Sequence, residues 1–149
     1  MSNPRTIYEI LQLLQNYHGG RRETYTRLAS EATDTMAQIL LKHLVELEDH
    51  SLKVVEGEMR QLDPKHATYL SSGPVLSSEL AHASDCHCAQ NPTFQEALGC
   101  ALDSEPLVDQ LLHRLEGSSA APSVEALARR LRDLEETKNR QIANFTRQD

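Results

Sequence analysis

Hydrophobic residues recur at every third or fourth position over most of the chain, a spacing that is typical of amphipathic α-helices. Four long helices are expected, at about residues 4–32, 35–62, 93–115 and 123–145. No run of alternating apolar and polar residues stands between turn signals, as a half-buried strand would require. The pattern therefore predicts an all-α chain.

The breaks between these segments indicate how the helices are connected. Thr33 and Asp34 form a turn and a helix N-cap signal, and a link this short forces the first two helices to pack antiparallel. Asp63 and Pro64 end the second helix. Residues 63–92 then form a long connection. We expect one domain, residues 1–149, in which two antiparallel helical hairpins are joined by this crossover.

Two sites inside the predicted helices can interrupt them. Gly19 and Gly20 lie within the first helix, and each destabilises a helix by about 1 kcal/mol relative to alanine. The apolar positions before and after them share one phase, which favours a continuous helix. A break there would instead give five helices and a different bundle. Pro106 is expected to bend the third helix.

Composition and charge exclude several functions. The chain has 149 residues and a formal net charge of −7, so it lacks the basic surface of a nucleic-acid-binding protein. No apolar run reaches the ~18 residues that cross a bilayer, and no signal peptide is recognisable at the N-terminus. We therefore expect a cytoplasmic protein with no membrane association, in which the three cysteines are reduced.

Several polar residues fall where a helix bundle should be apolar. His18 and Glu105 lie at the centres of their apolar stripes, and Lys138 does so beside Glu135. His50 lies at the edge of the second stripe, one heptad after His43. Isolated buried charges are strongly destabilising, so these side chains are expected to meet one another or a metal ion.

Three segments, residues 25–29, 44–50 and 101–112, resemble the ferritin-like superfamily in its rubrerythrin-type branch. The resemblance implies an up-down-down-up four-helix bundle. It also implies a di-iron or di-manganese site built from one Glu on each of two helices and a Glu-x-x-His pair on each of the other two.

The family's ligand positions are only half matched. The resemblance places the first Glu at His18 and the third-helix Glu at Glu105. It places one Glu-x-x-His pair at Leu47 and His50, and the other at Glu135 and Lys138. Two carboxylates are too few to balance two dications, and a protonated lysine cannot bind a metal.

Two interpretations of this core stay open. Four residues could hold a single Fe, Mn or Zn ion: His18, His50, Glu105 and Glu135. Alternatively, Lys138 takes the place of a metal by pairing with Glu105 or Glu135. The second interpretation is favoured. Glu46, one turn from His50, could substitute for the missing Glu, but it points away from the stripe centre.

The favoured interpretation predicts a non-catalytic interaction, sensing or structural module with no assigned catalytic residue and no cofactor. The alternative is a metal-binding protein or a metal-dependent oxidoreductase. A homodimer is expected because three leucines, Leu13, Leu41 and Leu111, lie off the core stripes, and another protein partner is compatible with the same surface.

A second group of metal-ligating residue types lies in the long connection. It consists of His82, Asp85, Cys86, His87 and Cys88. Cysteine and histidine in a loop suit zinc or a redox thiol, but Cys-x-Cys is not the usual zinc spacing and no second pair completes a four-ligand site. We favour loop residues that pack over the bundle. Cys100 is expected to be a small buried residue of the third helix.

Overall fold

A computed structural model describes residues 6–67, 90–103, 105–117 and 121–145, without the side chains of Ala67, Glu105 and Leu107. These residues are almost entirely helical and include no β-strand. The long helices are α1 (Ile7–Glu31), α2 (Thr35–Gln61), α4 (Phe94–Asp103), α5 (Glu105–Gly117) and α6 (Pro122–Phe145), and a short helix, α3 (Pro64–Ala67), follows α2. The all-α prediction is confirmed.

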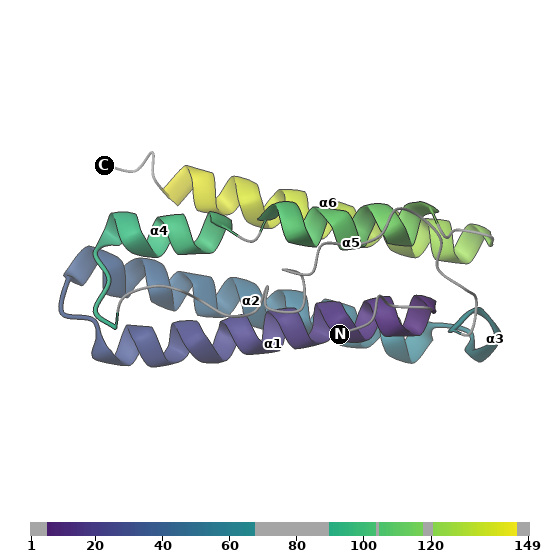
Figure 1. The fold of residues 1–149 in the computed structure, drawn as a ribbon, viewed down its shortest axis with the longest axis horizontal. Coiled ribbons are helices and arrows are strands. Elements are labelled where there is room, and N and C mark those ends of the chain that lie inside the picture. The colour runs from purple at the N-terminus through teal and green to yellow at the C-terminus, as the bar shows by residue number, and fades with distance from the viewer. Residues whose placement is uncertain (1–5, 68–89, 104, 118–120, 146–149) are drawn as a thin grey trace.

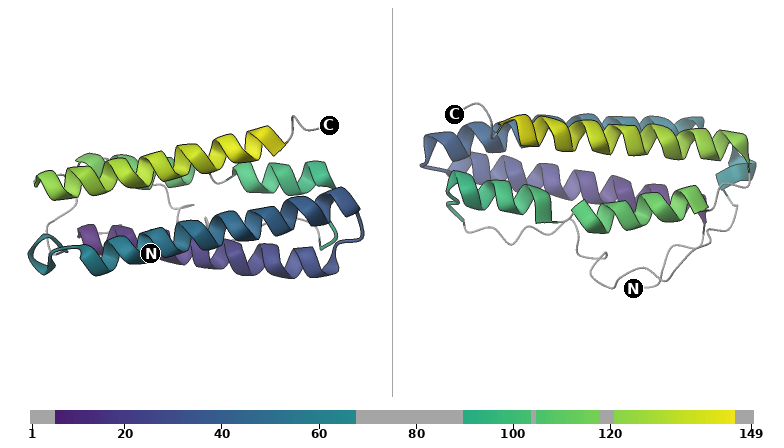
Figure 2. Two further views of the ribbon diagram at one scale, coloured as in Figure 1. Left: turned by 180° about the vertical axis from the view of Figure 1, so that it is seen from behind. Right: turned by 90° about the horizontal axis from the view of Figure 1, so that it is seen from above.

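The helices form two antiparallel layers (Figures 1 and 2). One layer is the hairpin of α1 and α2. In the other, α4 and α5 follow one another along the same side of the molecule, and α6 returns antiparallel beside them. α2 and the α4–α5 segment run in the same direction, so the chain crosses the length of the molecule between them.

Polar caps fix the ends of the helices at the α1–α2 turn. Asp34 accepts a hydrogen bond from the backbone N–H of Met36 at 3.1 Å through one carboxylate oxygen, and from that of Phe94 at 3.1 Å through the other. Thr93 and Glu96 exchange backbone-to-side-chain hydrogen bonds of 3.2 and 3.0 Å, which is the capping box of α4. Asp34 therefore ties the start of α4 to the start of α2.

α1 is continuous through Gly19 and Gly20, so the alternative with a broken first helix is wrong. The predicted third helix is instead divided, because α4 ends at Asp103 and α5 begins at Glu105. Pro106 is the second residue of α5. A proline there lacks only an N–H that the first turn does not use, whereas inside a continuous helix its ring would clash with the preceding turn.

Two hydrophobic clusters lie along the bundle, one toward each end. The first is formed mainly by the first half of α1, α5 and the first half of α6. The second is formed by the end of α1, the start of α2 and parts of α4 and α6. The middle of α1, α2 and α6 lies between them in sequence, and there most of the buried side chains are polar, with Leu52 as an apolar exception. This arrangement places a polar layer across the middle of the bundle.

Within the described residues, no helix is both long enough and apolar enough to cross a membrane.

Candidate functional site

The polar layer comprises six buried residues from three helices. They are His18 and Arg21 on α1, Glu48 and Ser51 on α2, and Glu135 and Lys138 on α6. None is more than 9% exposed. Two cations and two carboxylates lie in the layer, so its formal charge is balanced when His18 is neutral.

Glu48 is the centre of the layer, with both carboxylate oxygens bound. Its Oε1 accepts a hydrogen bond from Lys138 Nζ at 3.0 Å, and its Oε2 lies 2.7 Å from His18 Nδ1. An ionised carboxylate can only accept, so His18 donates from Nδ1. Lys138 Nζ also lies 3.4 Å from Glu135 Oε1. The ammonium group of Lys138 thus bridges the carboxylates of α2 and α6.

The titration of these groups reflects their burial and their partners. Burial alone would raise the pKa of Glu48, but the charge of Lys138 and the hydrogen bond from His18 outweigh it and lower that pKa to about 2. For Lys138, burial lowers the pKa, and the carboxylates of Glu48 and Glu135, together with Tyr17, raise it well above its usual value. Both Glu48 and Lys138 are therefore charged at neutral pH.

Arg21 extends the layer toward α4. Its Nη2 donates to the backbone oxygen of Cys100 at 2.8 Å, and its guanidinium lies 5.6 and 5.5 Å from the ring centres of Tyr17 and Tyr25. Burial raises the pKa of Tyr25, so that phenol is neutral. The aromatic rings offer the two buried cations favourable surroundings, because Lys138 Nζ also lies 5.6 Å from the Tyr17 ring centre.

The structure brings three of the five predicted core residues together, namely His18, Glu135 and Lys138. His50 lies on the exposed side of α2. The side chain of Glu105 lies outside what the structure describes, as do His82, Asp85, Cys86, His87 and Cys88. His43 is half-buried and its ring stacks on Phe145, with ring centres 5.4 Å apart.

Glu48 was not predicted from the sequence because the apolar residues of α2 were used to define its buried face, and Leu47 was assigned to that face instead. The buried residues of α2 include 37, 41, 44, 48, 51, 55 and 58, which alternate steps of four and three. This heptad spacing contains Glu48 and Ser51 and excludes Leu47 and His50. The heptad rule, applied without regard to polarity, would have found both.

Two other sequence expectations are wrong. Leu41 and Leu111 are 0% and 2% exposed, so they pack inside the bundle and give no outer face for a dimer. Cys100 is half-buried and forms a disulfide bond, so this cysteine is not a reduced thiol. Disulfides are typical of oxidising compartments.

The donor set of the polar layer does not fit a di-metal site. Among the described residues, no group of three or more His, Cys, Asp or Glu side chains could hold a metal ion. The ammonium of Lys138 stands between the two carboxylates that would have to bind the metal. Within the part of the chain that the structure describes, the buried Ser51 hydroxyl has no hydrogen-bond partner, and a serine is a poor ligand for iron, manganese or zinc.

In comparisons with known proteins, no protein-family model, no curated protein and no solved structure matches this chain.

Proposed function

We propose that the chain is a ferritin-like bundle in which a buried lysine ammonium replaces the metal, and that it acts as a non-catalytic interaction, sensing or structural module. The course of the helices supports this relation, because two antiparallel pairs are joined by a long crossover (Figure 1). The sequence spacing of the residues in the polar layer also supports the ferritin-like relation.

The spacing concerns two pairs of residues, each separated by three positions. Glu48 and Ser51 face the polar layer from α2, and Glu135 and Lys138 face it from α6. These are the relative positions of the two Glu-x-x-His pairs of the family. The two histidines are replaced by serine and lysine, and His18 stands where the first helix of the family carries a Glu.

One observation carries the proposal: Lys138 Nζ lies within 3.0 Å of Glu48 and 3.4 Å of Glu135. A dication bridging these carboxylates would have to occupy the same place as the ammonium. The ammonium supplies positive charge without an open coordination position, so it stabilises the layer and cannot activate a bound water or oxygen.

Metal reconstitution tests the proposal. The protein is incubated without oxygen with Fe²⁺, Mn²⁺ or Zn²⁺, passed through a desalting column and analysed for metal. Wild type should retain less than about 0.1 equivalent, since metal binding needs deprotonated ligands. One or more equivalents in wild type, lost in Glu48→Gln, would contradict the proposal and favour a metal-dependent protein.

Variants that restore the metal ligands of the family provide the complementary test, in which metal binding should be gained. The triple variant His18→Glu/Ser51→His/Lys138→His restores the family pattern and should retain metal, whereas His50→Ala should behave like wild type. Lys138→His alone removes the blocking ammonium with a smaller risk of misfolding, and circular dichroism checks that each variant is helical. Failure of every folded revertant to take up metal would contradict the assignment of these positions.

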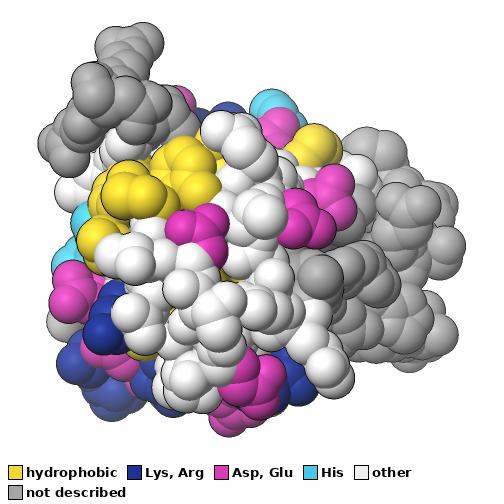
Figure 3. Space-filling view, turned by 90° about the vertical axis from the view of Figure 1, so that its left-hand side faces the viewer, with side chains coloured by type: hydrophobic (Ala, Val, Ile, Leu, Met, Phe, Trp, Pro, Cys, Tyr) yellow, Lys and Arg dark blue, Asp and Glu magenta, His cyan; other side chains and the backbone are white. Residues whose placement is uncertain are grey.

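A homodimer stays part of the proposal, through a different surface from the one expected. Hydrophobic side chains gather at the end of the molecule formed by the α1–α2 turn, the start of α4 and the end of α6 (Figure 3). Met36 and Ile39, near the start of α2, are 46% and 48% exposed. Light scattering should give twice the chain mass, reduced to one chain in Met36→Gln/Ile39→Gln. A wild-type monomer at tens of micromolar contradicts it.

The cytoplasmic location stays a prediction that the disulfide of Cys100 makes testable. Alkylation of thiols in intact cells, followed by mass spectrometry of the peptide that carries Cys100, distinguishes the two environments. A reduced Cys100 supports the cytoplasmic location, and a stable disulfide indicates an oxidising compartment.

A further inference from the structure

A surface pocket opens between α5 and α6, directly over one residue of the polar layer. Its volume is about 410 Å³, near the lower end of the range for small-molecule sites. The residues around it are Pro106, Asp109, Leu112, Arg132, Glu135, Glu136 and Asn139.

Glu135 distinguishes this pocket from an ordinary surface hollow. The residue is 9% exposed, and among the described residues its carboxylate is held by one ion pair, with Lys138 Nζ 3.4 Å from Oε1. Lys138 lies closer to Glu48, at 3.0 Å. A largely buried carboxylate that lines a pocket and shares a single ammonium with another carboxylate has accepting capacity left for a donor from a ligand.

The charged residues around the pocket favour a positively charged ligand. Three carboxylates line it, on Asp109, Glu135 and Glu136, against one guanidinium, on Arg132. Arg132 is already engaged by Glu116 and lies 3.5 Å from Asp109. Asp109 also lies 3.2 Å from His113, so Glu135 and Glu136 are the carboxylates that would attract a cation here, whereas an anion would meet net repulsion.

The apolar residues that line the pocket favour a ligand with a short hydrophobic part. Pro106 and the buried Leu112 give the pocket apolar walls, which suit a short alkyl chain. A primary ammonium has three N–H donors, which match the carboxylates in the pocket lining, on Glu135, Asp109 and Glu136.

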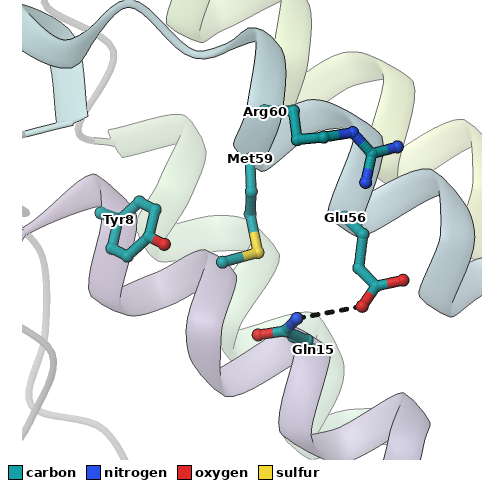
Figure 4. A pocket seen from close by; sticks show the side chains of 5 residues that line it. All are labelled: Tyr8, Gln15, Glu56, Met59 and Arg60. Carbon is teal, nitrogen blue, oxygen red and sulfur yellow. Dashed lines mark hydrogen bonds between the residues drawn. The ribbon is translucent and has the colours of Figure 1, made fainter.

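A second pocket provides the contrast. It lies between α1 and α2, has a volume of about 220 Å³ and is lined by Tyr8, Gln15, Glu56, Met59 and Arg60 (Figure 4). Its carboxylate is satisfied, because Gln15 Nε2 donates to Glu56 Oε2 at 3.2 Å. It therefore lacks the feature that marks Glu135.

We propose that the pocket between α5 and α6 binds a small aliphatic primary amine, with the ammonium on Glu135 and the alkyl chain against Pro106 and Leu112. The proposal does not depend on the ferritin-like relation, because it uses only the pocket and its charges. It gives the sensing role a ligand class, since the amine would compete with Lys138 for Glu135 and leave the Lys138–Glu48 bond in place.

Amide NMR titration with 1,4-diaminobutane tests the proposal, at constant ionic strength and pH. Saturable shifts are expected in the α5 and α6 residues around the pocket. 1-Butanol and butyrate have similar alkyl chains without the positive charge, and neither should saturate. Tetramethylammonium at the same concentration controls for unspecific attraction to an acidic protein. Equal shifts with tetramethylammonium, or shifts spread evenly over the surface, would overturn the proposal.

Two matched variants locate the site. Glu135→Gln should weaken amine binding roughly tenfold or more, because it removes the charged acceptor and keeps its shape. Glu125→Gln is the same change on the same helix at an exposed residue that pairs with Arg129, and it should bind like wild type. If Glu135→Gln does not fold, Glu136→Gln replaces it, with a smaller loss of affinity expected. Undiminished binding in every folded pocket variant would refute the site.

Discussion

Replacement of Lys138 by methionine is the most informative perturbation of the polar layer. Methionine fills a similar volume without charge, so the change removes the ammonium from between Glu48 and Glu135. Glu48 then keeps only the hydrogen bond from His18, at 2.7 Å. Because Glu48 is 4% exposed, water cannot replace the lost partner.

The magnitude follows from the titration of Glu48. Its pKa is lowered from 4.5 to about 2, which corresponds to about 3 kcal/mol of preference for the charged form. Removal of one partner from a buried ion pair typically destabilises by about 3–5 kcal/mol. We therefore expect Lys138→Met to lower the free energy of unfolding by about 3–5 kcal/mol at neutral pH.

The pH dependence of the variant gives a sharper signature. Without Lys138, the folded protein must hold one extra proton on the His18–Glu48 pair to neutralise the buried carboxylate. Above pH ~6.5 an unfolded histidine has lost that proton, so the folded state binds more protons than the unfolded state. Stability of the variant should then fall with rising pH, by up to about 1.4 kcal/mol per unit. Wild type should show no such slope between pH 6 and 9.

Urea unfolding followed by circular dichroism at several pH values measures these effects. The double variant Glu48→Gln/Lys138→Met removes both charges and should recover most of the lost stability. Lys53→Met is the matched surface control, because Lys53 is 73% exposed and pairs with Asp49, and it should change stability by less than about 1 kcal/mol. A loss below about 1 kcal/mol for Lys138→Met, or a pH profile parallel to that of wild type, would refute the reasoning.

Three further predictions concern other parts of the helices. Wild type should lose about 3 kcal/mol of stability as the pH falls from 4.5 toward 2. The reason is that ionised Glu48 stabilises the folded state, and this contribution disappears as Glu48 becomes protonated. In urea titrations, Glu48→Gln should show a smaller loss of stability over the same pH range. Gly19→Ala should raise the free energy of unfolding by up to about 1 kcal/mol, since an added Cβ meets nothing within 4 Å; a decrease would indicate that the helix needs glycine there. Arg130→Ala should destabilise by about 1–3 kcal/mol, because it leaves the buried Glu58, bound at 2.6 and 3.0 Å, without its guanidinium, and an unchanged urea midpoint would show that Glu58 is hydrated instead.

Much of the fold could be predicted from the sequence, because long amphipathic helices require apolar residues at every third or fourth position. The ends of α1, α2 and α6 fall within a few residues of the predicted ones. The division between α4 and α5 was only expected as a bend, since a proline in the first turn of a new helix and a proline that kinks a continuous one leave the same pattern.

The polar layer could be predicted only in part. Lys138, Glu135 and His18 are recognisable because they interrupt otherwise apolar stripes. Glu48 was not predicted because the apolar Leu47 beside it was assigned to the buried face of α2 instead. As a result, the residue that pairs with Lys138 was not identified. Arg21 was missed because arginine in a helix is normally a surface residue. The rings beside it, those of Tyr17 and Tyr25, lie on the same helix, but its hydrogen bond to Cys100 is a tertiary contact that the helical pattern does not contain.

The central claim, that the ammonium of Lys138 occupies the place of a metal, is tested most directly by NMR of lysine side-chain ammonium groups. The Nζ signal of Lys138, assigned by its loss in Lys138→Met, should be slowly exchanging because the group is 5% exposed and hydrogen-bonded to Glu48. It should persist through pH 6–9 and stay unchanged in excess Zn²⁺. Loss or displacement of this signal with stoichiometric zinc uptake would contradict the account.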